Sequence, residues 1–179
     1  MCCKQSNLSD CKGVNTNQFL QKAIALKKNF LSLIIFSFVI ATCTKVDVFE
    51  KNVTIPGHEW SSTFKPEIVF EITDTLSTYN IFAVLRHSDA YRYKNIWMNI
   101  YTYAPGDTVN KQQLDLRLAT DDKGWLGSGM DDIYQHRILI TRKPVALTAG
   151  TYRFKLENVM REDPLEHVLN VGIRVEKTR

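Results

Sequence analysis

Few side chains in this chain have the types and spacing that catalysis requires. Gly127-Ser128-Gly129 places a serine between glycines, but a hydrolase nucleophile needs Gly-x-Ser-x-Gly between a strand and a helix. With Gly124, the same glycines also lack the Gly-Lys-Ser/Thr end of a phosphate loop and the βαβ unit of a dinucleotide site. The pattern favours a tight, bulged loop and predicts no catalytic residue.

Metal ligands are equally sparse in the sequence. Four acidic residues flank the glycine-rich loop without the alternating spacing of a calcium loop, so we expect a solvated acidic turn there. The histidines are scattered, with no helical pairing and no acidic partner at ligand spacing, so a zinc site would require a tertiary coincidence. The sequence predicts neither a metal nor another cofactor. These residues are Asp121, Asp122, Asp131 and Asp132, and His58, His87, His136 and His167.

Cysteine is the residue type whose position indicates chemistry. The cysteines are Cys2, Cys3, Cys11 and Cys43, so the chain beyond Cys43 can form neither a disulfide nor a thiolate metal site. Residues 27–42 have the layout of a signal peptide: two lysines, an apolar run of 12 residues at 30–41, and a small residue before Cys43. As a helix this run would measure about 18 Å, which is shorter than the hydrocarbon core of a membrane.

The end of the apolar run resembles a bacterial lipobox. In that motif, here Ile40-Ala41-Thr42-Cys43, the cysteine is joined to a diacylglycerol and becomes the new N-terminus. We therefore predict that acylated Cys43 anchors the protein in a membrane; the alternative is an ordinary cleaved signal followed by an incidental cysteine. Because Thr44 replaces the aspartate that favours inner-membrane retention, we expect the outer membrane, with its periplasmic or surface face left open.

The domain boundaries and the charge follow from this layout. Residues 1–26 are predicted to be a mis-called or extended N-terminus, residues 43–65 the lipid anchor, a tether and a candidate edge strand, and residues 66–179 a β-sandwich. The net charge of +4 comes entirely from residues before Cys43, since acidic and basic residues balance from there on. This balance disfavours a nucleic-acid partner.

The mature chain consists of short segments with the two-residue period of β-strands. Residues 113–118 place three leucines on one face, and residues 151–157 and 168–177 alternate similarly. Residues 67–72 and 79–86 are predicted to be neighbouring antiparallel strands. About eight strands and no long amphipathic helix predict an all-β fold, a single antiparallel sandwich that is Ig-like or jelly-roll-like.

Aromatic residues provide the best candidates for binding. Trp97, Tyr101 and Tyr103 share one strand face and Trp125 is expected near a loop, as in a partner-binding or glycan-binding surface. Packing in the core explains the strand residues equally well. Thr75 and Thr108 lie in Asp-Thr-apolar tripeptides like those that Bacteroidota glycosylate on the threonine oxygen, which makes both candidate modification sites.

Five stretches carry a resemblance to a known family, and their order and spacing matter more than any one of them. They are residues 79–87 (YNIFAVLRH), 91–97 (YRYKNIW), 126–133 (LGSGMDDI), 160–165 (MREDPL) and 171–177 (VGIRVEK). From about residue 43 to its end, the chain resembles the GldH family of gliding-motility lipoproteins from Bacteroidota.

The resemblance implies a non-enzymatic lipoprotein of the outer membrane. Its partners would be other envelope proteins of the machinery for gliding and type IX secretion, although similar proteins also occur in Bacteroidota that do not glide. Cys43 is the residue to which the resemblance gives a role, as the lipid attachment point. The alternative function is a lipid-anchored carbohydrate-binding module, and the oligomeric state stays open.

Overall fold

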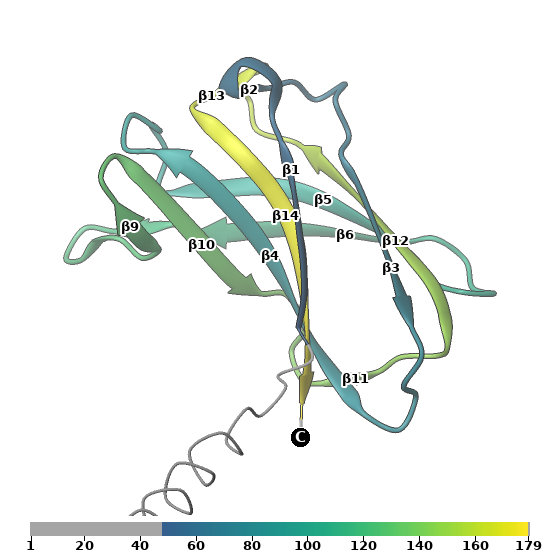
Figure 1. The fold of residues 1–179 in the computed structure, drawn as a ribbon. Coiled ribbons are helices and arrows are strands. Elements are labelled where there is room, and N and C mark those ends of the chain that lie inside the picture. The colour runs from purple at the N-terminus through teal and green to yellow at the C-terminus, as the bar shows by residue number, and fades with distance from the viewer. Residues whose placement is uncertain (1–47, 179) are drawn as a thin grey trace, which may run out of the picture. The chain divides into compact units, whose positions relative to one another are not determined.

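Alternating segments become β-strands throughout the part of the chain that the structure describes, residues 48–178 of the computed structural model (Figure 1). Strands of six or more residues number eight, as the sequence predicts. They are β1 (Val48–Thr54), β3 (Glu67–Ile72), β4 (Thr78–Ser88), β5 (Asn95–Tyr103), β6 (Asn110–Arg117), β10 (Ile133–Leu139), β12 (Gly150–Asn158) and β14 (Val168–Thr178).

Short elements connect these strands. A 3-10 turn, η2 (Pro56–His58), follows β1 and has a left-handed backbone at Gly57, the residue type that adopts this conformation at least cost. The remaining strands have two or three residues each. They are β2 (Glu59–Trp60), β7 (Ala119–Thr120), β8 (Gly124–Trp125), β9 (Ser128–Met130), β11 (Val145–Ala146) and β13 (Leu165–Glu166).

The strands form two antiparallel layers, so the predicted all-β sandwich is confirmed. One sheet has six strands in the order β1-β14-β4-β10-β9, with β11 paired to β4, and the other has four in the order β3-β12-β5-β6 (Figure 1). β13 pairs with β2, and β7 pairs with β8. An aromatic contact joins the layers, since the ring centroids of Phe49 on β1 and Phe70 on β3 lie 5.3 Å apart. Within the four-stranded sheet, Phe70 stacks on Phe154 of β12.

Burial follows the two-residue period that the sequence shows. On β12 the side chains of Tyr152, Phe154 and Leu156 are buried between the sheets, and on β14 those of Val171 and Ile173 are buried with them. Their sequence neighbours face outward and are more exposed, apart from Gly172, which is also buried. Because one face of each sheet must leave water, this alternation is sufficient to determine which face packs in the core.

The predicted pairing of residues 67–72 with residues 79–86 is wrong. β3 pairs with β12, whereas β4 pairs with β14 and β10, so the two strands lie in different sheets. The five residues between β3 and β4 carry the chain from one layer to the other. Asp74 shapes this connection, since its Oδ1 accepts from the Leu76 N–H and its carbonyl accepts from the Tyr79 hydroxyl. Strand propensity gives no information on which partner a strand selects.

The two ends of the sandwich differ in the segments that they carry. β1 begins with Val48 beside the end of β14, and β4 also begins there, because Thr78 is paired with Thr178. Ser88, at the other end of β4, is paired with Ile133, the first residue of β10. The loops that follow β4 and precede β10 therefore lie at the end of the sandwich opposite Val48, which we call the far end.

Candidate functional site

Three loops converge at the far end of the sandwich. They are residues 89–94 between β4 and β5, residues 126–132 around β9, and residues 159–164 between β12 and β13. The Asp89 N–H donates to the Asp132 carbonyl at 2.7 Å, and the Tyr93 hydroxyl donates to Glu162 Oε2 at 2.8 Å. Segments about 70 residues apart in sequence therefore form one continuous loop cluster.

A buried pair of histidines lies at the base of this loop cluster. The Nε2 atoms of His87 on β4 and His136 on β10 are 2.9 Å apart, and Nδ1 of His87 is 2.7 Å from the Ser88 carbonyl oxygen. Because a carbonyl can only accept, Nδ1 of His87 donates to it. The Nε2–Nε2 contact needs one donor and one acceptor, so at least one ring is neutral; when both are neutral, Nε2 of His87 accepts the hydrogen on Nε2 of His136.

Burial keeps this histidine pair neutral. The side chains of His87 and His136 are 0% and 2% exposed. Burial lowers the pKa of His87, and burial with the nearby charge of His87 lowers the pKa of His136 to about 4. The titratable rings that pack against them are those of Tyr91 and Tyr134, and burial raises the pKa of Tyr91.

Trp125 packs over the histidine pair and does not join the other predicted surface aromatics. Its ring centroid lies 4.4 Å from that of His87 and 5.7 Å from that of Tyr134. Trp97 projects instead from β5 in the four-stranded sheet. The predicted set of four aromatic residues is therefore divided between two places.

Trp97, Tyr101 and Tyr103 share the outer face of the four-stranded sheet. Trp97 is 41% exposed, whereas both tyrosines are half-buried. Lys111 Nζ lies 5.3 Å from the centroid of the Tyr101 ring, and the guanidinium carbon of Arg153 lies 5.7 Å from that of Tyr103. Cations thus cover the two tyrosine rings, and Trp97 offers the most accessible aromatic surface of the three.

Glu157 organises the polar residues of the same outer face. It accepts hydrogen bonds from Asn99 and from the Tyr101 hydroxyl, and it forms an ion pair with Lys65 at 2.5 Å. Burial alone would raise the pKa of Glu157, but the bonds from Lys65, Asn99 and Tyr101 hold it at about 2. The carboxylate is therefore ionised and fixes the position of the Tyr101 hydroxyl.

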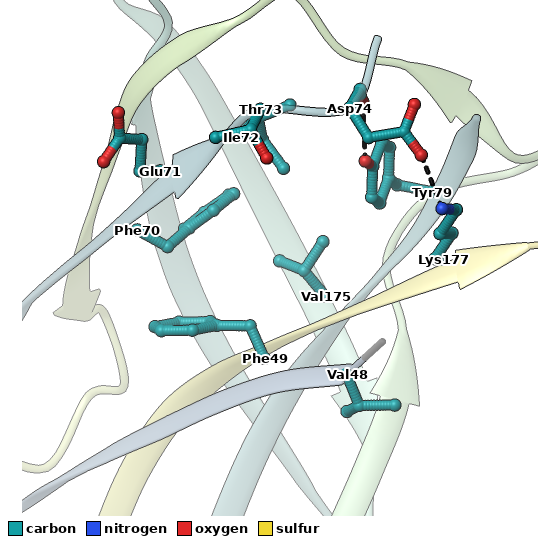
Figure 2. Close-up of a pocket in the computed structure, with 10 residues that line it drawn as sticks. All are labelled: Val48, Phe49, Phe70, Glu71, Ile72, Thr73, Asp74, Tyr79, Val175 and Lys177. Atoms are coloured by element: carbon teal, nitrogen blue, oxygen red, sulfur yellow. Dashed lines mark hydrogen bonds and ion pairs between the residues drawn. The ribbon is translucent and has the colours of Figure 1, made fainter. Parts of the chain in front are cut away.

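A cavity of about 370 Å³ opens between β1 and β3, near the end of the sandwich that contains Val48 (Figure 2). Figure 2 shows Phe49, Phe70 and Val175 facing it, with Asp74 and Lys177 paired at its rim. This cavity has an apolar floor and a charged rim, and none of its residues was singled out from the sequence. The full lining is Val48, Phe49, Phe70, Glu71, Ile72, Thr73, Asp74, Tyr79, Val175 and Lys177.

The remaining predicted site residues lie in loops or outside the described chain. Thr75 and Thr108 are exposed, in the β3–β4 and β5–β6 connections. Cys43 lies outside the described residues, as do the predicted signal peptide and residues 1–26. Between residues 48 and 178 we find no cluster of three side chains suited to hold a metal ion, and no helix long and apolar enough to cross a membrane.

Comparison with known proteins assigns this architecture to a family. The model of the GldH lipoprotein family matches residues 47–175. The chain belongs to the GldH lipoprotein family. It is 24% identical over 161 residues to a gliding motility lipoprotein GldH homolog of Christiangramia forsetii, covering 84% of this chain and 98% of that protein. It is 23% identical over 157 residues to the gliding motility lipoprotein GldH of Flavobacterium johnsoniae, covering 84% and 97%.

The family predicted from the sequence is thus confirmed, and the structure locates the stretches that carry the resemblance. Residues 79–87 and 171–177 are paired strand segments of the six-stranded sheet. Residues 91–97, 126–133 and 160–165 meet at the far end, in and beside the loop cluster. Resemblance to the GldH family is therefore concentrated on one sheet and one end of the domain.

Proposed function

We propose that this GldH-family chain is an outer-membrane lipoprotein, anchored by acylated Cys43, that acts as a non-enzymatic component of the machinery for gliding motility and type IX secretion. Family membership over residues 47–175 supports the assignment to gliding motility, since both relatives are named as gliding motility proteins. The partners would be other proteins of the cell envelope, as the resemblance implies.

The position of Cys43 relative to the folded domain carries this proposal. Val48, the first residue of β1, is five residues after Cys43, and all seven residues of β1 are paired with β14. Five extended residues span at most about 18 Å. An acylated Cys43 would therefore hold the sandwich close to the membrane and raise its effective concentration for partners in the same envelope layer.

The far end supports a scaffolding role rather than catalysis. The two buried histidines bond to each other and to a carbonyl, instead of orienting a hydroxyl or thiol nucleophile. Arg92 links the loops there, with Glu162 at 2.5 Å and Glu166 at 2.6 Å. Such exposed ion pairs contribute little stability individually, but here they fix the relative positions of two loops.

A lipid-anchored glycan-binding module is the alternative, and one observation favours it. Trp97 presents a 41% exposed indole on a broad sheet face, which is suited to stacking on a sugar ring. The cations above Tyr101 and Tyr103 cover the neighbouring rings, so the stacking surface would be a single residue.

The decisive experiment compares Cys43→Ala with Cys11→Ala in the native organism, by intact mass, N-terminal peptide analysis and membrane fractionation. We expect an acylated N-terminal Cys43 in the outer-membrane fraction of wild type and Cys11→Ala, and its loss in Cys43→Ala together with loss of surface spreading where the organism glides. An unmodified N-terminus in a soluble fraction of wild type would refute the anchor.

The two candidate modification sites lie in exposed loops, and both can be tested in the same samples. We propose O-glycosylation of Thr75 and Thr108, each of which follows an aspartate in an exposed connection. Peptides that contain Thr75 or Thr108 should show an added glycan mass, which Thr75→Ala or Thr108→Ala removes from the corresponding peptide. Unmodified peptides at both positions would exclude this modification.

A further inference from the structure

Strand β3 has one edge with which no described strand pairs, and we call it the open edge. Among the described strands it pairs with β12 alone. The Leu156 N–H donates to the Pro66 carbonyl at 3.0 Å, and bonded and non-bonded pairs alternate along an antiparallel ladder. The N–H and C=O groups of Glu67, Val69 and Glu71 therefore point away from β12, toward the open edge.

The open edge of β3 borders the cavity of Figure 2. Phe70 and Ile72 of β3 line the cavity on one side, and Val48 and Phe49 of β1 line it on the other. β1 is also an edge strand, since it pairs with β14 alone among the described strands. A backbone edge beside an apolar cavity has the two features that strand addition uses, because the edge supplies hydrogen bonds and the cavity accepts alternate side chains.

Other edges of the sandwich are less suited to an added strand. β6, at the opposite edge of the same sheet, contributes no residue to the lining of this cavity. β9, at the edge of the six-stranded sheet opposite β1, has only three residues. On β3, by contrast, Val69 is 43% exposed in the middle of the open edge.

Charge indicates what such a strand would contain. The side chains of Glu67, Val69 and Glu71 lie on the outer face of the sheet. Glu67 pairs with Lys155 at 2.9 Å, whereas Glu71 forms no ion pair with any residue between 48 and 178. A strand beside β3 would place basic residues next to Glu71 on the outer face and apolar residues toward the cavity on the inner face.

We propose that β3 binds an extended segment of a partner protein, alternately apolar and basic, as an added strand of the four-stranded sheet. The identity of the partner as an envelope protein rests on the proposed function, but the binding chemistry does not. The added segment would bond to the outward N–H and C=O groups of β3 and insert its apolar side chains beside Phe70 and Phe49.

The test uses the full chain in detergent and a fluorescent nine-residue peptide in which Val and Phe alternate with Lys and Thr. Val69→Pro removes an outward N–H without disturbing the ladder to β12, so we expect it to weaken peptide binding by about tenfold or more. Val69→Thr keeps the N–H and the branched side chain, so it serves as the matched control and should bind like wild type.

Glu71→Lys provides a second variant that leaves the edge backbone unchanged. It should weaken binding of the basic peptide and strengthen binding of a peptide in which Glu replaces Lys. Equal binding of a scrambled peptide, or peptide binding that neither Val69→Pro nor Glu71→Lys changes, would overturn the proposal. A wild-type dimer that Val69→Pro dissociates in sedimentation would also overturn it, because a second copy would then occupy the edge.

The two proposals fail separately. Peptide binding does not depend on lipidation, so an unmodified Cys43 would refute the anchor and leave the β3 site intact. Conversely, loss of peptide binding in Val69→Pro, with Cys43 acylated and surface spreading unchanged, would establish the site and refute its use in gliding. Failure of the wild-type protein to bind the basic peptide would refute the site alone.

Discussion

Acidification should destabilise the domain through the buried His87–His136 pair. In the folded protein the pKa of His136 is about 4, because burial and the neighbouring histidine disfavour its charged form. An unfolded histidine titrates near 6.5. The folded state therefore binds fewer protons between these values, so the stabilisation by the neutral pair is complete above about pH 6.5 and is lost as the pH falls toward 4.

The size of the effect follows from the difference between the two pKa values. At pH 5 the unfolded histidine is almost fully protonated and the folded one almost fully neutral, which lowers the free energy of unfolding by about 2 kcal/mol relative to pH 7.5. His87 adds to this in the same direction, since burial lowers its pKa too. Carboxylates such as Glu157, whose pKa is lowered to about 2, lose their contribution mainly below pH 4.5. The histidines thus dominate between pH 5 and 6.5.

Urea unfolding followed by tryptophan fluorescence measures this directly, because Trp125 packs on His87. We expect wild type to lose about 2 kcal/mol or more between pH 7.5 and pH 5. His136→Gln should start less stable but lose much less over the same interval, since only His87 then titrates. His58→Asn removes an exposed histidine outside this pair and serves as the control variant. A flat wild-type profile, or an unchanged slope in His136→Gln, would refute the reasoning.

Three further predictions concern packing, an ion pair and the exposed tryptophan. A Cβ on Gly127 would lie 2.6 Å from the Gln135 carbonyl oxygen, so Gly127→Ala should cost about 2 kcal/mol and lower the urea midpoint; an unchanged midpoint would contradict the close approach. Glu157→Gln should cost about 1 kcal/mol at pH 7, since its partner Lys65 is partly exposed, and the difference from wild type should vanish as the pH falls from 4.5 toward 2. Trp97→Ala should leave retention on immobilised polysaccharide unchanged, and reduced retention would instead favour the glycan-binding alternative.

The burial of individual site residues could be predicted from the sequence, but their assembly into one site could not. His87 lies on the same inward-facing side of β4 as Tyr79, Ile81 and Leu85, so its burial follows from the two-residue period of the strand. Its partner, however, is 49 residues away, on a strand whose register is set by pairing. A single sequence shows which face a residue occupies, and it does not show which residue of another strand lies opposite.

The cavity beside β3 could not be predicted for the same reason. Its floor combines residues from β1, β3 and β14, and the cavity exists because β1 and β3 are edges of different sheets on the same side of the sandwich. The sequence suggested instead that residues 67–72 pair with the strand that follows them, which would have covered the open edge. The length of the loop between β3 and β4 is compatible both with pairing of these strands in one sheet and with crossing to the other layer. Only the packing of the two layers decides between these arrangements.

The sequence by itself determined the class of the domain, its family and which face of each long strand is buried. These properties depend on local composition and on alternation, which act on each segment separately. Tertiary structure alone decided the strand order, the histidine pair, the separation of Trp125 from Trp97 and the open edge of β3. Each of these depends on contacts between distant segments, and their energies are set by the geometry of packing rather than by the preferences of any one segment.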